Sequence, residues 1–199
     1  DGIYASSDGG ASWTAINGTG EGALPRLNGE ISTFGLFRDT RTSPAGLVTM
    51  VQGSGVFLTL DEGKTWAAVN TGLPGLTFTG PFSQTVNRFY VPVEGYGFHV
   101  ASGQGAGVNW TAAFSGLPRN VRSVMSSGVA NLLFATTYSG VYRSTDNGLT
   151  WQAASNGLPS SRTRSVTIDP NNPLVAYASA DTVFKSSDGG LNWNRSDQG

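Results

Sequence analysis

The chain of 199 residues has no cysteine and a single histidine, and only 13% of its residues are charged. Without cysteine, disulfide bonds, thiolate metal sites and cysteine nucleophiles are excluded. One histidine, His99, is too few for the usual zinc or haem sites, and we interpret it as a half-buried residue of a strand. The sequence therefore predicts no metal and no cofactor.

Runs of like charge and long apolar stretches are also lacking. The net charge is −1, and the 12 lysines and arginines are scattered, which argues against nucleic-acid binding. The longest apolar runs are too short to span a bilayer, and no basic amphipathic helix indicates membrane binding. The predicted partner is therefore neither a nucleic acid nor a membrane.

The chain does contain a repeated eight-residue phrase, Ser-x-Asp-x-Gly-x-Ser/Thr-Trp. Four copies are clear, and a fifth keeps only its second glycine and its tryptophan. The defining positions are Ser6, Asp8, Gly10 and Trp13; Thr59, Asp61, Gly63 and Trp66; Gly107 and Trp110; Ser144, Asp146, Gly148 and Trp151; and Ser186, Asp188, Gly190 and Trp193. All five tryptophans close a copy, at separations of 41 to 53 residues. A period of this length among strand formers indicates a propeller or solenoid array.

Each clear copy lies between two strand-like runs, so it predicts the turn of a β-hairpin. The aspartate carboxylate is expected to accept N–H groups of the turn, and the hydroxyl two residues earlier to do the same. The second glycine is expected to take a positive φ, and the tryptophan to cover the turn. A catalytic carboxylate is needed once or twice, not four times, so we predict a structural role for these residues and no catalytic one.

A second phrase, Leu-Pro, follows each of the first four tryptophans, and two more strand-like runs separate it from the next copy. These runs are 31–37 and 47–51, 78–86 and 89–93, 121–125 and 132–136, and 164–168 and 174–178. Each unit thus has four strands, which is one propeller blade. The predicted organisation is a single segment, 1–199, with half a blade at 1–19 and blades at 24–70, 74–115, 118–155 and 159–197.

The eight-residue phrase resembles the Asp-box, or BNR repeat. That repeat occurs in sialidases, sortilin-type receptors, xyloglucan-hydrolysing enzymes, a photosystem II assembly factor and secreted bacterial repeat proteins. The resemblance implies an all-β propeller, which we expect to be part of a larger one. In those families the Asp-box lies on the outer hairpin of a blade, away from the ligand face. The resemblance therefore implies a fold and carries over no active-site residue.

A glycoside hydrolase is the enzymatic alternative, and it needs two carboxylates that face a sugar cleft. Outside the Asp-boxes, Glu30 and Asp39 flank the first strand of the second blade, and Glu94 ends a strand of the third. We interpret all three as solvated loop residues. The Arg-Ile-Pro phrase of sialidases is absent. A carbohydrate-binding or hydrolytic propeller, sialidase-like or xyloglucanase-like, stays open if its catalytic part lies outside this chain.

The favoured prediction is a non-catalytic binding or assembly module that acts outside the cytoplasm, secreted, periplasmic or at the cell surface. Its expected partner is another protein or the remainder of a larger propeller, with a glycan as the alternative. Both ends of the chain read as internal repeats. We therefore expect residues 3–6 and the last blade to border another part of the same protein or a partner chain.

Overall fold

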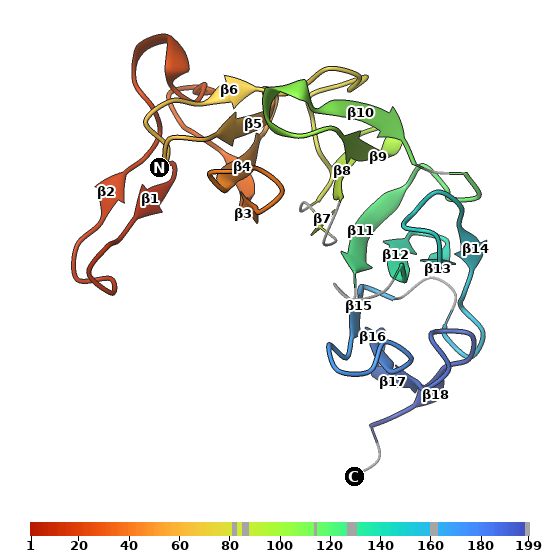
Figure 1. Cartoon of the computed structure of the whole chain (residues 1–199). Helices are drawn as coiled ribbons and strands as arrows, with labels where there is room; N and C mark the ends of the chain where they lie inside the picture. Colours follow the sequence, from red (N-terminus) through yellow and green to blue (C-terminus); the bar gives the residue numbers. More distant parts are fainter. Residues whose placement is uncertain (81–82, 85–87, 114, 127–130, 160–162, 198–199) are drawn as a thin grey trace. The chain divides into compact units, whose positions relative to one another are not determined.

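The computed structural model describes residues 1–80, 83–84, 88–113, 115–126, 131–159 and 163–197. Within these residues the chain is all-β, and its helical segments are two short 3-10 turns, η1 (Gly20–Gly22) and η2 (Gly105–Gly107) (Figure 1). This outcome follows from short β-branched and aromatic runs that alternate with turns rich in Gly, Asp and Asn.

The strands form one hairpin and then four four-stranded sheets, each with its strands in chain order. The hairpin joins β1 (Tyr4–Ala5) and β2 (Thr14–Ala15). The sheets contain β3 (Thr33–Asp39), β4 (Gly46–Val51), β5 (Gly55–Thr59) and β6 (Ala67–Ala68); β7 (Ser83–Gln84), β8 (Phe89–Val93), β9 (Gly97–Ser102) and β10 (Asn109–Ala112); β11 (Val121–Ser126), β12 (Leu133–Thr137), β13 (Gly140–Ser144) and β14 (Gln152–Ala153); and β15 (Ser165–Ile168), β16 (Ala176–Ser179), β17 (Val183–Ser186) and β18 (Asn194–Arg195). The predicted half blade followed by four complete four-stranded blades is confirmed.

Strand limits differ from the predicted ones where a turn extends into a strand-like run. The run predicted at 174–178 becomes a strand only at Ala176. Val175 still belongs to the turn, because its N–H donates to the carbonyl of Asn172 at 2.9 Å. The run predicted at 78–86 lies partly outside the described residues.

By its internal contacts the chain divides into two compact units. The first is Asp1–Phe78 with Ala101–Trp110, and the second is Thr79–Val100 with Thr111–Gly199. Each unit has its own apolar core. The core of the first unit contains Ile3, Leu24, Ile31, Val51, Phe57 and Trp66. The blade limits given above stay a prediction.

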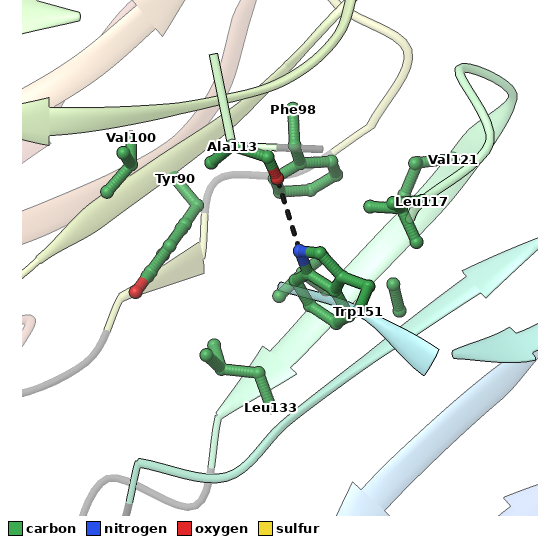
Figure 2. Packing of buried hydrophobic residues seen from close by; sticks show 10 residues of the cluster. Tyr90, Phe98, Val100, Ala113, Leu117, Val121, Leu133 and Trp151 are labelled. Atoms are coloured by element: carbon green, nitrogen blue, oxygen red, sulfur yellow. Dashed lines mark hydrogen bonds between the residues drawn. The ribbon is translucent and has the colours of Figure 1, made fainter. Parts of the chain in front are cut away.

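In the second unit, the sheet β11–β14 buries both of its faces. Side chains alternate between the faces of a strand, so successive residues of β12 enter two different clusters. Leu133 and Ala135 pack in the cluster that contains Trp151 (Figure 2). Phe134 packs in the other cluster, where its ring lies edge-on to the ring of Trp193, with the two ring centroids 5.8 Å apart. Each tryptophan thus helps to fill the space between one sheet and the next.

His99 lies in β9, opposite Val91 of β8. The expectation of a half-buried side chain is wrong, because only 5% of His99 is exposed. The first five residues of β9 are all buried, so the side chains on both faces of this inner strand are covered. Burial lowers the pKa of His99, partly offset by a hydrogen bond with the backbone of Gly97. This environment favours the neutral imidazole.

Candidate functional site

The Asp-box at Asp146 forms a turn whose polar groups bond to one another. The Ser144 hydroxyl donates to Oδ1 of Asp146 at 2.7 Å and accepts the N–H of Gly148 at 2.8 Å. Thr150 donates its N–H to Oδ1 at 2.9 Å and its hydroxyl to Oδ2 at 2.6 Å. Both oxygens of the carboxylate therefore accept hydrogen bonds inside their own turn.

The other three clear copies repeat this geometry. The first hydroxyl donates to the carboxylate at 2.8 Å in the copies of Asp8 and Asp188 and at 2.7 Å in that of Asp61. In the last copy the amide of Asn192 replaces the second hydroxyl and donates to Oδ2 at 2.8 Å. The second glycines all have positive φ: Gly10 at 95°, Gly63 at 85°, Gly148 at 78° and Gly190 at 83°. The structural role of the four carboxylates stays a prediction, which two experiments below test.

Hydrogen bonds to the ionised form depress the pKa of each Asp-box carboxyl. The side chain and N–H of Thr65, with the Thr59 hydroxyl, lower the pKa of Asp61 to about 2. Bonds from Asn192 and Ser186 lower the pKa of Asp188 to about 2. The pKa of Asp8 is also lowered, first by its bond from Ser12. At Asp146, burial favours a raised pKa, but the bonds from Thr150 and Ser144 outweigh it and the pKa falls.

Replacing Asp146 by alanine is expected to lower the free energy of unfolding by about 1–3 kcal/mol, because the amide of Thr150 and the two hydroxyls lose their acceptor. Chemical denaturation followed by circular dichroism measures this change. Glu94→Ala removes an exposed carboxylate of the same unit and is the control, with an expected change within about 0.5 kcal/mol. Unchanged stability of Asp146→Ala with loss of a binding activity would show that the carboxylate has a chemical role instead.

Stability is expected to fall with acidification below pH 4. The Asp-box pKa values are lower in the folded chain than the ordinary value of 3.8, so these groups stabilise the fold fully above about pH 4. That contribution is lost as the pH falls through about 2, where the folded carboxyls take up protons. Melting temperatures measured between pH 6 and pH 2 test this. The double variant Asp61→Asn/Asp188→Asn should be less stable at pH 6 and less sensitive to pH; an unchanged slope would contradict the assignment.

The tryptophan that closes each later Asp-box donates its indole N–H to the preceding blade. Nε1 of Trp151 lies 3.2 Å from the carbonyl oxygen of Ala113, three residues after Trp110 (Figure 2), and its N–H is shared with the carbonyl oxygen of Gly148 in its own turn, at 3.1 Å. The same relation holds for Trp66 and the carbonyl of Ile16 at 2.7 Å, Trp110 and Val69 at 2.6 Å, and Trp193 and Ala154 at 2.9 Å. In every case the acceptor is the third residue after the previous tryptophan. We call this contact the inter-blade indole bond.

The backbone of the same tryptophans also meets the preceding blade. The N–H of Trp193 donates at 2.9 Å to the carbonyl of Asn156. A Cβ on the next residue, Gly157, would collide with the carbonyl oxygen of Trp193. The glycine of the Gly-Leu-Pro phrase thus provides the space into which the next tryptophan backbone fits. Sequence reasoning missed this role, although the constant spacing of six residues between tryptophan and glycine was a usable signal.

Trp13 differs from the other four tryptophans. Its side chain is 62% exposed, whereas Trp66, Trp110, Trp151 and Trp193 are at most 4% exposed. Its indole N–H donates to the carbonyl of Gly10 in its own turn at 3.1 Å, as that of Trp151 does to Gly148, but within the described residues it makes no inter-blade indole bond. The comparison shows that the sheet neighbour, and not the Asp-box itself, buries the tryptophan ring.

The carboxylates considered for glycosidase chemistry have different surroundings. Glu30 and Glu94 are exposed, as expected. The interpretation of Asp39 as a solvated residue is wrong, because it is 1% exposed and pairs with Arg41, whose Nε lies 2.8 Å from Oδ1 and Nη2 3.0 Å from Oδ2. A bidentate partner two residues away allows this carboxylate to be buried. Asp39, the last residue of β3, thus fixes the start of the β3–β4 connection through Arg41.

A cavity of about 580 Å³ opens in the second unit. Its lining residues are Thr79, Gly80, Gly95, Arg119, Asn120, Val121, Arg122, Tyr138 and Arg164. They come from the segments that precede β7 and β15, from the segment before β11 with the first two residues of that strand, or from the turns β8–β9 and β12–β13. In an antiparallel sheet these segments all lie at one end, and the turn between the third and fourth strands lies at the other. The cavity is therefore at the opposite end of the blades from the Asp-boxes.

Metal sites and membrane-spanning helices are both absent from the described residues. That part of the chain contains no cluster of three or more His, Asp or Glu residues placed to hold a metal ion. No described helix is long and apolar enough to cross a membrane. The polar side chains that line the cavity are those of arginine, tyrosine, asparagine and threonine residues.

The repeat at Asp146 also matches a known family. The model of the BNR/Asp-box repeat matches residues 142–153. This chain therefore contains the BNR/Asp-box repeat. A search of curated protein sequences found no match.

Solved structures similar to this Asp-box chain are propellers of several kinds. A GH74 xyloglucanase from Xanthomonas campestris has a TM-score of 0.59 and 18% identity, with 75% of this chain and 28% of the enzyme covered. YCF48 bound to D1 peptide has a TM-score of 0.63 and 14% identity, with 98% and 60% covered. The extracellular domain of a hybrid two-component system from B. thetaiotaomicron has a TM-score of 0.63 and 13% identity, with 94% and 24% covered.

These likenesses show the β-propeller fold alone, because the identities are low. The chain spans 24–29% of the length of the GH74 proteins that it resembles. Glycoside hydrolase activity is therefore a property of the GH74 proteins. The binding partner of each similar structure is likewise a property of that protein.

Proposed function

We propose that this Asp-box chain is a non-catalytic module that binds a segment of another protein. The observation that carries the proposal is the position of the cavity. Segments of the second unit that belong to three successive sheets meet there, at the end of the blades where no Asp-box lies. Loops on a rigid sheet scaffold can change their side chains without disturbing the blades, so this end is suited to recognition.

The lining of the cavity fits a polypeptide ligand. Asn120 is exposed and offers an amide that can donate to and accept from a peptide backbone. Tyr138 is 65% exposed and supplies a large, rigid contact surface of the kind that dominates protein interfaces. YCF48, which has the same fold, has been solved with a bound D1 peptide, and this supports a peptide-sized ligand for a propeller of this type.

We also propose that the chain acts outside the cytoplasm, and that its blades assemble with further blades or with a partner chain. The extracellular domain from B. thetaiotaomicron supports the first point by its similar fold. The exposed ring of Trp13 supports the second, because every other tryptophan of the chain is covered by a neighbouring blade.

Panning of a random peptide library displayed on phage against the immobilised chain tests peptide binding. Peptides that enrich on the chain are expected to lose binding to Tyr138→Ala. The matched control is Tyr177→Ala, since Tyr177 is also exposed and also contacts a cation, with Nζ of Lys185 5.7 Å from the ring centroid. Failure of any peptide to enrich, or equal loss of binding in both variants, would overturn the proposal.

A further inference from the structure

We propose that the cavity of the second unit selects the carboxylates of an acidic peptide segment. This inference rests on the proposed function, and it adds the chemical class of the ligand. The site is a basic cavity in a chain whose formal net charge is −1. Its basic character therefore comes from the local arrangement of a few side chains.

Three arginines define the charge of the cavity: Arg119, Arg122 and Arg164. They are a quarter of the 12 lysines and arginines of the chain. No Asp or Glu occurs among the described lining residues, and Glu94, the acidic neighbour of Gly95 in the sequence, does not line the cavity. Positive charge gathered in a concave site raises the local concentration of anionic ligands and speeds their binding.

The tertiary fold brings these arginines together. Arg119 lies just before β11 and Arg122 is the second residue of β11, whereas Arg164 immediately precedes β15, more than 40 residues later. Contacts between β11 and β15 place the two blades side by side within the second unit. A ligand that crosses the cavity can therefore meet guanidinium groups from two blades.

Arg122 is held in place by an aromatic ring. Its guanidinium carbon lies 4.9 Å from the ring centroid of Tyr138, within the range of a cation–π contact. A guanidinium fixed in this way loses less conformational freedom when it binds, and its planar set of donors matches a carboxylate in a bidentate pair. Tyr138 thus acts as a positioning residue for Arg122 as well as a contact surface.

The same contact favours a peptide over an acidic sugar. A sugar that binds by stacking uses an aromatic face, and Arg122 already occupies one of the two faces of the Tyr138 ring. Asn120, in contrast, offers the paired donor and acceptor that a peptide backbone needs. A nucleic acid would bind through a basic surface that neutralises many phosphates, whereas this chain has three arginines in one cavity.

The experiment measures binding of a fluorescein-labelled peptide of alternating glutamate and serine by fluorescence anisotropy, with the glutamine–serine peptide as its neutral counterpart. The acidic peptide is expected to bind at least about tenfold more tightly, which corresponds to one charge-assisted hydrogen bond. Its affinity should fall as salt is raised, because salt screens charges at exposed sites. Equal affinity for the two peptides would overturn the inference.

Arginine variants locate the binding. Arg122→Gln and Arg164→Gln should each weaken binding of the acidic peptide by about tenfold or more. Arg122→Lys keeps the charge and loses the bidentate geometry, so an intermediate affinity is expected. Arg38→Gln removes an exposed arginine of β3 in the first unit and should leave the affinity unchanged. Equal losses in Arg38→Gln and Arg164→Gln would contradict the site, and melting temperatures show whether each variant is folded.

Competition experiments separate the classes of ligand. The competitors are oligogalacturonate, a single-stranded oligonucleotide and the unlabelled acidic peptide. If oligogalacturonate or the oligonucleotide displaces the labelled peptide at a lower concentration than the unlabelled peptide does, the preferred ligand is a glycan or a nucleic acid, and the inference is wrong. If the peptides enriched from the phage library are neutral and bind through Tyr138, the proposed function is supported but the preference for acidic peptides is disproved. Absence of enriched peptides would disprove the proposed function itself.

Discussion

Replacing Trp151 by alanine is expected to lower the free energy of unfolding by about 3–5 kcal/mol, the usual effect of removing a buried aromatic side chain. Trp151 is 4% exposed and packs among residues of two sheets. Its loss leaves a cavity between blades and removes the donor to the carbonyl of Ala113. Denaturant titration followed by circular dichroism gives the change, because other tryptophans would complicate a fluorescence signal.

Two further variants assign this effect to the neighbouring blade. Trp13→Ala changes the same Asp-box position, but its ring is 62% exposed, so the expected change is below about 1 kcal/mol. Trp151→Phe keeps an aromatic ring and loses the inter-blade indole bond, and we expect about 1–3 kcal/mol for the unsatisfied carbonyl of Ala113. Similar losses in Trp13→Ala and Trp151→Ala would show that the tryptophan acts within its own turn.

Replacing Gly157 by alanine is the second change with a large expected effect, although it adds one methyl group. The residue has φ of 89°, which costs about 1–2 kcal/mol for a residue with a Cβ. The added Cβ also meets the carbonyl oxygen of Trp193, and such overpacking costs a further 1–3 kcal/mol, roughly. The backbone atom cannot rotate away as a side chain could, so the two blades must separate slightly.

Gly9→Ala is the matched control for the glycine experiment. Gly9 has φ of 72°, and no atom lies within 4 Å of its ideal Cβ position. It therefore carries the backbone strain without the inter-blade contact. Thermal and denaturant unfolding of both variants separate the two contributions. If Gly9→Ala destabilises the chain as much as Gly157→Ala, the close approach of the Trp193 backbone has no energetic importance.

The repeat, the four strands of each blade and the bonding inside the Asp-box could all be predicted from the order of residue types. The Ser144 hydroxyl and the Asp146 carboxylate reach partners two to four residues away, so the spacing of the residue types specifies the turn. Strand formers between such turns specify hairpins for the same reason. These features are local, and a local hydrogen bond requires no knowledge of where distant segments lie.

The contacts between blades depend on the tertiary structure. The indole N–H of Trp193 donates to the carbonyl of Ala154, 39 residues away in the sequence. The ring of Trp13 has no such neighbour and is exposed. The arginine cavity likewise combines segments of three sheets that no motif links. The burial of Asp39 depended on the course of the β3–β4 connection, which its composition alone did not specify. The indole bonds and the cavity join elements distant in the chain, and the sequence pattern of one element does not contain such contacts.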